Sequence, residues 1–122
     1  MRVAIFGGAF DPIHTAHVRV AQEAADRFHL DRVLFIPSGN PPHKPSNSTT
    51  AYEHRFRMVE LACSCDDRFE ASRLEQGEGK SYSIDTIGKV RAALAPGAEL
   101  FFLIGADAVA VLHVVELARD IA

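Results

Sequence analysis

The feature that most constrains this chain is a regular alternation between short apolar runs and stretches with helical periodicity. Three runs are apolar at every position and end at a glycine or proline, namely 3–6, 33–36 and 100–104, with a weaker candidate at 69–71. Apolar residues spaced three and four apart predict helices over roughly 14–28, 50–62 and 83–94. A run that is apolar on both faces is typical of a parallel strand covered by helices on both sides. The sequence therefore predicts an α/β fold with a doubly wound parallel sheet and right-handed crossovers.

Breakers and capping signals mark the other segments. The stretch 37–50 contains four prolines and is interpreted as a long loop, which in a compact domain is usually functional or mobile. Thr50 and Glu53 form a capping-box pattern at the start of the second predicted helix. We expect one or two short helices over 106–122. Because the chain has the size of one domain and no internal repeat or linker, residues 1–122 are interpreted as a single domain.

Charge and composition exclude several classes of protein. The net charge is −3 and the pI is near 6.0, which argues against binding nucleic acid through bulk positive charge, so any anion must be held by a local site. No apolar run approaches the roughly 20 residues that a membrane span needs. Cys63 and Cys65 are the only cysteines, and on a helix end they point in different directions. We expect them to be reduced thiols in a cytoplasmic protein.

The segment after the first run, residues 7–17, concentrates the chemistry. Two glycines allow a sharp turn and the close approach of a ligand to the backbone. His14 and His17 are three apart and therefore lie on one face of the first turn of the following helix, where amide groups and the helix dipole favour anions. A phosphate site is expected there, because ligands bind beyond the carboxyl ends of parallel strands. The same histidine spacing also suits half of a metal site, which would need a third ligand.

This segment resembles the signature G-x-F-D-P-x-H-x-x-H of the nucleotidyltransferase superfamily, whose fold is Rossmann-like. Within that superfamily the chain is most similar to the bacterial nicotinate-nucleotide adenylyltransferases. Four further stretches carry the resemblance, in the family's order: the P-P-H-K loop, the R-x-x-M-x-x-L-A helix, the S-Y-T-x-D-T segment and the G-x-D after the fourth strand. They correspond to 41–44, 55–62, 81–86 and 105–107.

The resemblance implies transfer of AMP from ATP to nicotinate mononucleotide, giving deamido-NAD and pyrophosphate, with Mg²⁺ bound through the ATP phosphates. It implies that His14, His17 and Lys44 bind the reacting phosphates and that no protein side chain is a metal ligand. Gly105 and Asp107 would contact a ribose. The remaining substrate-binding residues implied are Gly7, Gly8, Ala9, Phe10 and Ile13 at the first turn, and Tyr82, Asp85 and Thr86 around the nicotinate.

Some of these residues also have a purely structural interpretation. Asp107 suits the N-cap of a helix as well as it suits a ribose contact. Arg55 and Arg57 are expected to be surface charges, and Phe101 and Phe102 to be core residues without a functional role.

Two departures from the family pattern keep alternatives open. The later I-S-x-T-x-x-R segment of the family is absent. The aromatic residue that commonly follows G-x-D in the family is also missing, because residues 112–115 are Leu-His-Val-Val. We therefore interpret the chain as the N-terminal portion of a longer family member. One alternative is a phosphopantetheine adenylyltransferase, which shares the fold and the first motif. Another is a catalytically impaired nucleotide-binding fragment that forms a homo-oligomer through an exposed sheet edge.

Overall fold

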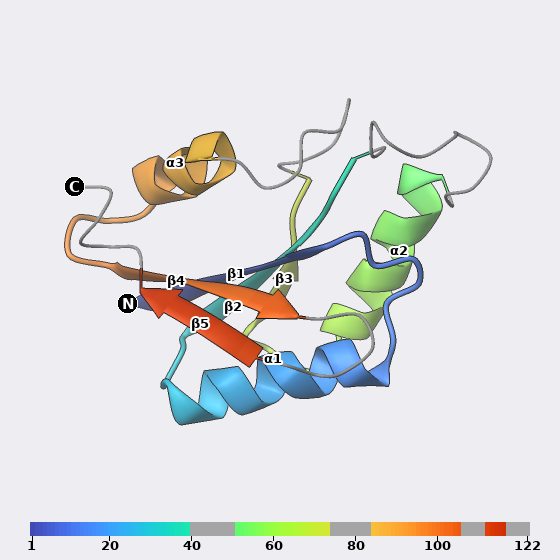
Figure 1. Cartoon of the computed structure of the whole chain (residues 1–122), viewed down its shortest axis with the longest axis horizontal. Coiled ribbons are helices and arrows are strands. Elements are labelled where there is room, and N and C mark those ends of the chain that lie inside the picture. Colours follow the sequence, from blue (N-terminus) through green and yellow to red (C-terminus); the bar gives the residue numbers. More distant parts are fainter. Residues whose placement is uncertain (40–50, 74–83, 106–111, 117–122) are drawn as a thin grey trace.

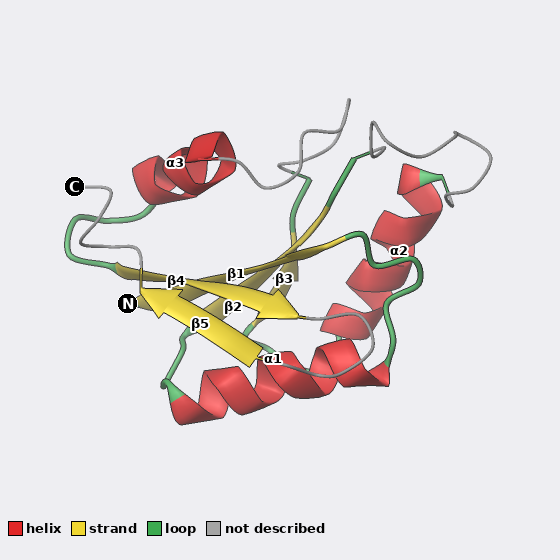
Figure 2. Ribbon diagram, viewed as in Figure 1, coloured by secondary structure: helices red, strands yellow, loops and turns green. Residues whose placement is uncertain are grey.

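The computed structural model describes residues 1–39, 51–73, 84–105 and 112–116, with backbone alone at 84–87, 104–105 and 112–116. Strands and helices alternate through most of the chain (Figures 1 and 2). The elements are β1 (Arg2–Gly8), α1 (Thr15–Arg27), β2 (Arg32–Pro37), α2 (Tyr52–Cys63), β3 (Phe69–Ala71), α3 (Ile84–Ala93), β4 (Glu99–Gly105) and β5 (Leu112–Glu116). The predicted strands and helices up to β4 are confirmed, with bounds shifted by a few residues.

The strands form one sheet in the order β3-β2-β1-β4-β5. β1 lies at its centre and pairs in parallel with β2 and with β4, while β3 pairs in parallel with β2. The chain first moves from β1 toward β3 and then returns to place β4 on the other side of β1. The strand order therefore reverses between β1 and β4, which is where sheets of this kind bind ligands at the carboxyl ends of the strands.

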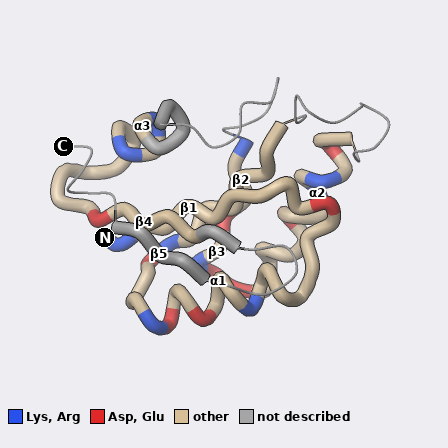
Figure 3. Tube along the Cα trace, viewed as in Figure 1, with Lys and Arg blue, Asp and Glu red and all other residues tan. Residues whose placement is uncertain are grey.

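Helices cover both faces of the sheet. Side chains of β1 alternate between the two faces: Val3 and Ile5 pack with Val90 of α3, whereas Ala4 and Phe6 pack with α1 and α2. Figure 2 shows α3 and α1 on opposite sides of the strands. The predicted doubly wound arrangement is thus confirmed. Exposed charges of both signs are spread along the outer side of α1 and are not gathered into a patch of one sign (Figure 3).

The capping box predicted for α2 is wrong. The N-cap is Ala51, which makes no side-chain capping bond, and Thr50 lies outside the described residues. Glu53 is used elsewhere, because its two carboxylate oxygens accept hydrogen bonds of 2.8 and 3.1 Å from Arg73. The guanidinium of Arg73 in turn lies 3.9 Å from the centre of the Phe56 ring. Glu53 therefore joins α2 to the residues after β3.

The prediction of only short helices over 106–122 is also wrong, because β5 lies within that range. β5 pairs antiparallel with β4, and Val115 stands opposite Phe102 in the register. Short apolar runs do not distinguish strand from helix by periodicity alone, and two adjacent valines favour the strand. The edge of β4 is consequently paired within the chain, which corrects the expectation that it is open to a second copy.

Both cysteines are unpaired, as predicted. Cys63 is buried at the end of α2, and this burial raises the pKa of its thiol to about 12, whereas Cys65 is exposed. The expected core position of Phe101 is confirmed, and Phe102 is half-buried against the face that α3 covers. Among the helices that the structure describes, none combines the length and the apolar character needed to cross a membrane.

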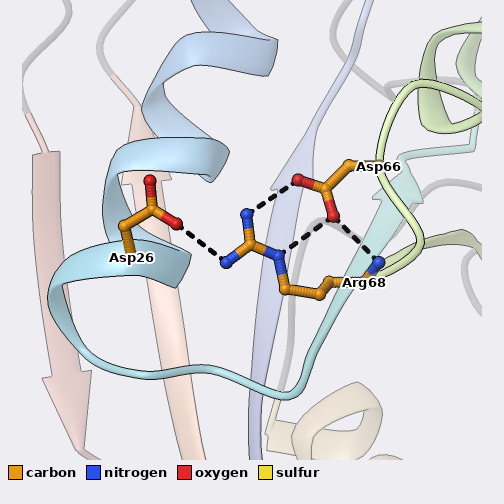
Figure 4. Close-up of polar contacts among 3 residues, drawn as sticks. All are labelled: Asp26, Asp66 and Arg68. Carbon is orange, nitrogen blue, oxygen red and sulfur yellow. Dashed lines mark hydrogen bonds and ion pairs between the residues drawn. The ribbon is translucent and has the colours of Figure 1, made fainter.

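An ion-pair network fixes the start of β3 against α1 (Figure 4). The backbone N–H and Nε of Arg68 donate to Oδ1 of Asp66 at 2.9 and 3.0 Å, and Nη2 donates to Oδ2 at 2.8 Å. Nη1 of the same guanidinium donates to Asp26 of α1 at 2.9 Å. These bonds to Arg68 hold the pKa of the Asp66 carboxyl below its ordinary value. Asp66 therefore contributes most to the stability of the fold while it is ionised, whereas the bond from Arg68 to Asp26 does not involve it.

We predict that Asp66→Asn lowers the free energy of unfolding at pH 7 by about 1–2 kcal/mol. The amide NH2 of asparagine cannot accept the bond from Nη2 of Arg68, and the bonds to its one oxygen lose the carboxylate charge. A carboxyl whose pKa is depressed in the folded state contributes fully above its unfolded pKa of about 3.9. Its contribution is lost as the pH falls through the lower, folded pKa. The gap between wild type and variant should therefore narrow below about pH 4 in denaturant unfolding.

Asp67→Asn is the matched control, since Asp67 is the exposed neighbour of Asp66. It should unfold as the wild type does at every pH. A gap between Asp66→Asn and wild type that stays constant down to pH 2, or an equal loss in Asp67→Asn, would contradict this interpretation of the network.

Candidate active site

The carboxyl ends of three strands meet at the point where the strand order reverses. Gly7 and Gly8 end β1 opposite Ile36 and Pro37 of β2, and the carbonyl of Gly8 accepts a 2.9 Å hydrogen bond from the backbone N–H of Ser38. On the other side, Phe6 stands opposite Leu103 of β4. β4 continues for two residues beyond this pair and ends at Gly105. The edge beside β1 is therefore lined by glycine backbone.

The turn that follows β1 contains a residue in the left-handed backbone region. Phe10 has a φ of 48°, in the left-handed region that costs a non-glycine residue about 1–2 kcal/mol. Its ring is only 2% exposed and packs edge-on against Phe6, with centroids 5.5 Å apart. The ring also lies against Gly8, where a Cβ would be 3.5 Å from it. Burial of the ring offsets the backbone strain, so the side chain of Phe10 belongs to the core and only its main chain remains for a ligand.

His14 and His17 come together at the N-terminus of α1. His14 is the N-cap, and its backbone N–H donates to Nδ1 of His17 at 3.0 Å. Because Nδ1 accepts this bond, the neutral imidazole of His17 carries its proton on Nε2, which is then a donor. The ring is held further by the edge-to-face contact with Phe10, at 5.1 Å between centroids. The His17 side chain is thus fixed in both tautomer and orientation.

The second imidazole lies beside the first but is more accessible. The two ring centroids are 3.9 Å apart, with 35° between the planes; His14 is exposed, whereas His17 is half-buried. The amide N–H of His17 donates to the carbonyl of His14 at 3.0 Å. The amides at the very start of a helix have no preceding carbonyl within it, and the dipole makes this end positive. Backbone amides and imidazole donors on one helix end are suited to binding phosphate oxygens.

The other predicted site residues fall into three groups. Ala9 and Ile13 are half-buried in the loop between β1 and α1, next to the histidines. Asp85 and Thr86 are described by their backbone, in the first turn of α3. Those outside the described residues are Lys44, Tyr82 and Asp107. In the part of the chain that the structure describes, no three His, Cys, Asp or Glu side chains are grouped to hold a metal ion.

The expectation that Arg55 is a surface charge is wrong. Its side chain is completely buried, and Nη1 donates to the carbonyl of Ala9 at 2.9 Å and to that of Ser38 at 2.8 Å. Arg57 is exposed as expected and pairs with Glu60 on the same helix. One signal could have separated the two arginines. Arg55 is four residues before Val59 and therefore shares the buried face of α2, whereas Arg57 does not.

Comparison with curated proteins finds close relatives in bacteria. The chain is 59% identical over its whole length to a protein from Solibacter usitatus named "Probable nicotinate-nucleotide adenylyltransferase", of which it spans 65%. It is 51% identical over 108 residues to the protein of the same name from Pelobacter propionicus, covering 88% of this chain and 50% of the relative. The chain thus spans between half and two thirds of the length of these relatives.

Solved structures show the same fold at lower sequence identity. The nicotinic acid mononucleotide adenylyltransferase of Plasmodium falciparum, complexed with NaAD, superposes with a TM-score of 0.67 at 21% identity, over 83% of this chain and 50% of that one. A second structure of the Plasmodium falciparum enzyme, complexed with APC, gives a TM-score of 0.60. The family model described as cytidylyltransferase-like matches residues 5–121, nearly the whole sequence, and the chain therefore belongs to the cytidylyltransferase-like family.

Proposed function

We propose that this chain carries the nucleotide-binding site of an adenylyltransferase that transfers AMP from ATP to nicotinate mononucleotide, giving deamido-NAD and pyrophosphate. The observation that carries the proposal is the hydrogen bond from the backbone of His14 to Nδ1 of His17, at the edge where β1 and β4 diverge. This hydrogen bond orients the imidazole so that Nε2 is a donor at a helix N-terminus, where phosphate groups bind. The names of the bacterial relatives support the choice of acceptor.

The reaction places few covalent demands on the protein. A nucleotide 5′-phosphate is largely dianionic at neutral pH, with a second pKa near ~6, so its oxygen attacks without a general base. A bond forms between that oxygen and the α-phosphorus of ATP, the bond from the α-phosphorus to the bridging oxygen breaks, and pyrophosphate leaves. The difficulty is to hold two anions in line and to stabilise charge on the leaving group. Fixed donors supply that stabilisation without having to reorganise.

In this proposal the two histidines and the first amides of α1 bind the reacting phosphates. Lys44 reaches the β- or γ-phosphate as a point charge. The main chain of the turn receives the nucleotide, and Gly105 and Asp107 contact a ribose. The other proposed substrate contacts are Gly7, Gly8, Ala9, Phe10 (through its backbone), Ile13, Tyr82, Asp85 and Thr86.

Mg²⁺ is proposed to be held by the phosphate oxygens of ATP and by water, since this ion keeps several of its waters and takes few protein ligands in such sites. When bound it neutralises part of the triphosphate charge. The protein's own contribution is to orient the phosphates through the imidazoles and amides at the start of α1. A cytoplasmic setting is proposed as well, because an exposed thiol such as Cys65 stays reduced there.

His17→Asn and His17→Ala separate the two roles of the ring. Asparagine keeps an acceptor oxygen close to the position of Nδ1 but lacks the Nε2 donor, whereas alanine lacks both. We predict that both variants lower kcat/KM for AMP transfer about 100-fold, the typical loss for one fixed donor. Only alanine should also lower the thermal midpoint, since it alone leaves the His14 amide without its acceptor.

His54→Ala is the control for the histidine series, because His54 is an exposed imidazole on α2. Its kcat/KM and thermal midpoint should equal those of the wild type. Wild-type turnover in His17→Ala would rule out a role of this ring in the reaction.

The acceptor is tested by product analysis with ATP and each of two phosphorylated compounds. We predict that AMP is transferred to nicotinate mononucleotide and not to phosphopantetheine. Transfer to phosphopantetheine alone would replace the proposed substrate. Binding of ATP and nicotinate mononucleotide in calorimetry without turnover of either acceptor would favour the nucleotide-binding fragment over the enzyme.

A further inference from the structure

We propose that Arg55 is a positioning residue, which clamps the loop after β1 to the loop after β2 and so fixes the backbone that receives the nucleotide. That this backbone binds a nucleotide rests on the proposed function, whereas the contacts of Arg55 belong to the fold and do not depend on it. Arg55 has no part in the predicted chemistry, and it contacts main chain just beyond the carboxyl ends of β1 and β2.

One nitrogen of Arg55 joins two segments that are distant in sequence. Nη1 donates at 2.9 Å to the carbonyl of Ala9, just beyond β1, and at 2.8 Å to that of Ser38, just beyond β2. The two segments already contact each other through the 2.9 Å bond from the Ser38 amide to the carbonyl of Gly8. A single guanidinium therefore closes a network across the ends of both strands.

The clamp sets which way the neighbouring amides face. In a trans peptide the C=O and N–H of one unit point in opposite directions. Since the carbonyl of Ala9 points to Arg55, the N–H of Phe10 lies on the other side of the loop, away from the guanidinium. The same reasoning places the N–H of Gly39 opposite the carbonyl of Ser38. Two backbone donors are thereby turned away from α2.

The loop needs such support because of its backbone conformation. Phe10 has a positive φ of 48°, and strained residues persist only where their surroundings over-determine them. The buried ring holds one side of this residue, and Arg55 holds the carbonyl that precedes it. The guanidinium is itself placed by the ring of Tyr52, which lies 5.5 Å from its central carbon.

Arginine is better suited to this position than lysine. Its planar group carries donors in fixed directions, so one nitrogen can reach two carbonyls from a single buried geometry. A lysine at the same place keeps the charge but holds it as a compact group on a flexible stem. The proposal therefore predicts a graded series, in which Arg55→Lys is intermediate and Arg55→Met, similar in length but apolar, loses the clamp.

The test combines local hydrogen exchange with ligand affinity. In Arg55→Met we expect the protected amide of Ser38 to exchange about tenfold faster, while the remote amide of Glu99, bonded to the carbonyl of Met1, keeps its rate. The Kd for ATP, measured by calorimetry, should rise by about tenfold. Arg55→Lys should recover part of both effects. Arg57→Met, on the exposed side of the same helix, should match the wild type.

Each other outcome overturns the proposal. Wild-type exchange at Ser38 in Arg55→Met, or equal acceleration at Ser38 and Glu99, would mean that Arg55 contributes only general stability. If Arg55→Met does not fold, Arg55→Lys decides: unchanged Ser38 exchange and ATP affinity would reject the clamp, and a selective change would support it. Failure of the wild type to bind ATP would instead contradict the proposed function, because the exchange comparison needs no ligand.

Discussion

The rest of the structure depends on the burial of the middle of β1. Its residues from Val3 to Phe6 have at most 1% exposure, and its peptide groups pair with β2 on one side and β4 on the other. The backbone of such a strand is accessible to a ligand only at its carboxyl end. In β1 this end is formed by Gly7 and Gly8, which have no side chains to block the approach. Because β4 is the neighbour of β1, this carboxyl end lies beside the carboxyl end of β4. The position of the candidate site is thus a consequence of the topology.

Three side chains support the turn beyond β1 from different directions. The ring of Phe10 is buried beneath it, Nδ1 of His17 accepts from the backbone of His14, and Arg55 binds the carbonyl of Ala9. Each contact either pairs a polar group of the backbone or restrains the conformation of the turn. A preorganised turn of this kind can stabilise developing negative charge without first paying for its own reorganisation. Rigidity here links the packing of the core to the chemistry proposed at its edge.

Local signals made much of this predictable from the sequence. Continuous apolar runs identified the parallel strands, and the spacing of His14 and His17 placed both rings on one helix turn. The errors arose where a distant partner decided the outcome. The carbonyl partners that hold Arg55 lie 46 and 17 residues away in the chain, and the only local sign of its burial is the helix face that it shares with Val59. Likewise β5 depends on the edge of β4, and the expected Thr50 cap failed where Glu53 pairs with Arg73.

The central claim is that the fold itself fixes the His17 ring with a donor at Nε2. The most direct measurement is the ¹⁵N spectrum of the imidazoles at a pH where they are neutral, with and without ATP. The account predicts a pyridine-like Nδ1 and a protonated, pyrrole-like Nε2 for His17 before any ligand is added, with ATP shifting chiefly Nε2. A proton on Nδ1, or averaged signals from two exchanging tautomers, would show that the His14 amide does not hold this ring and would contradict the account.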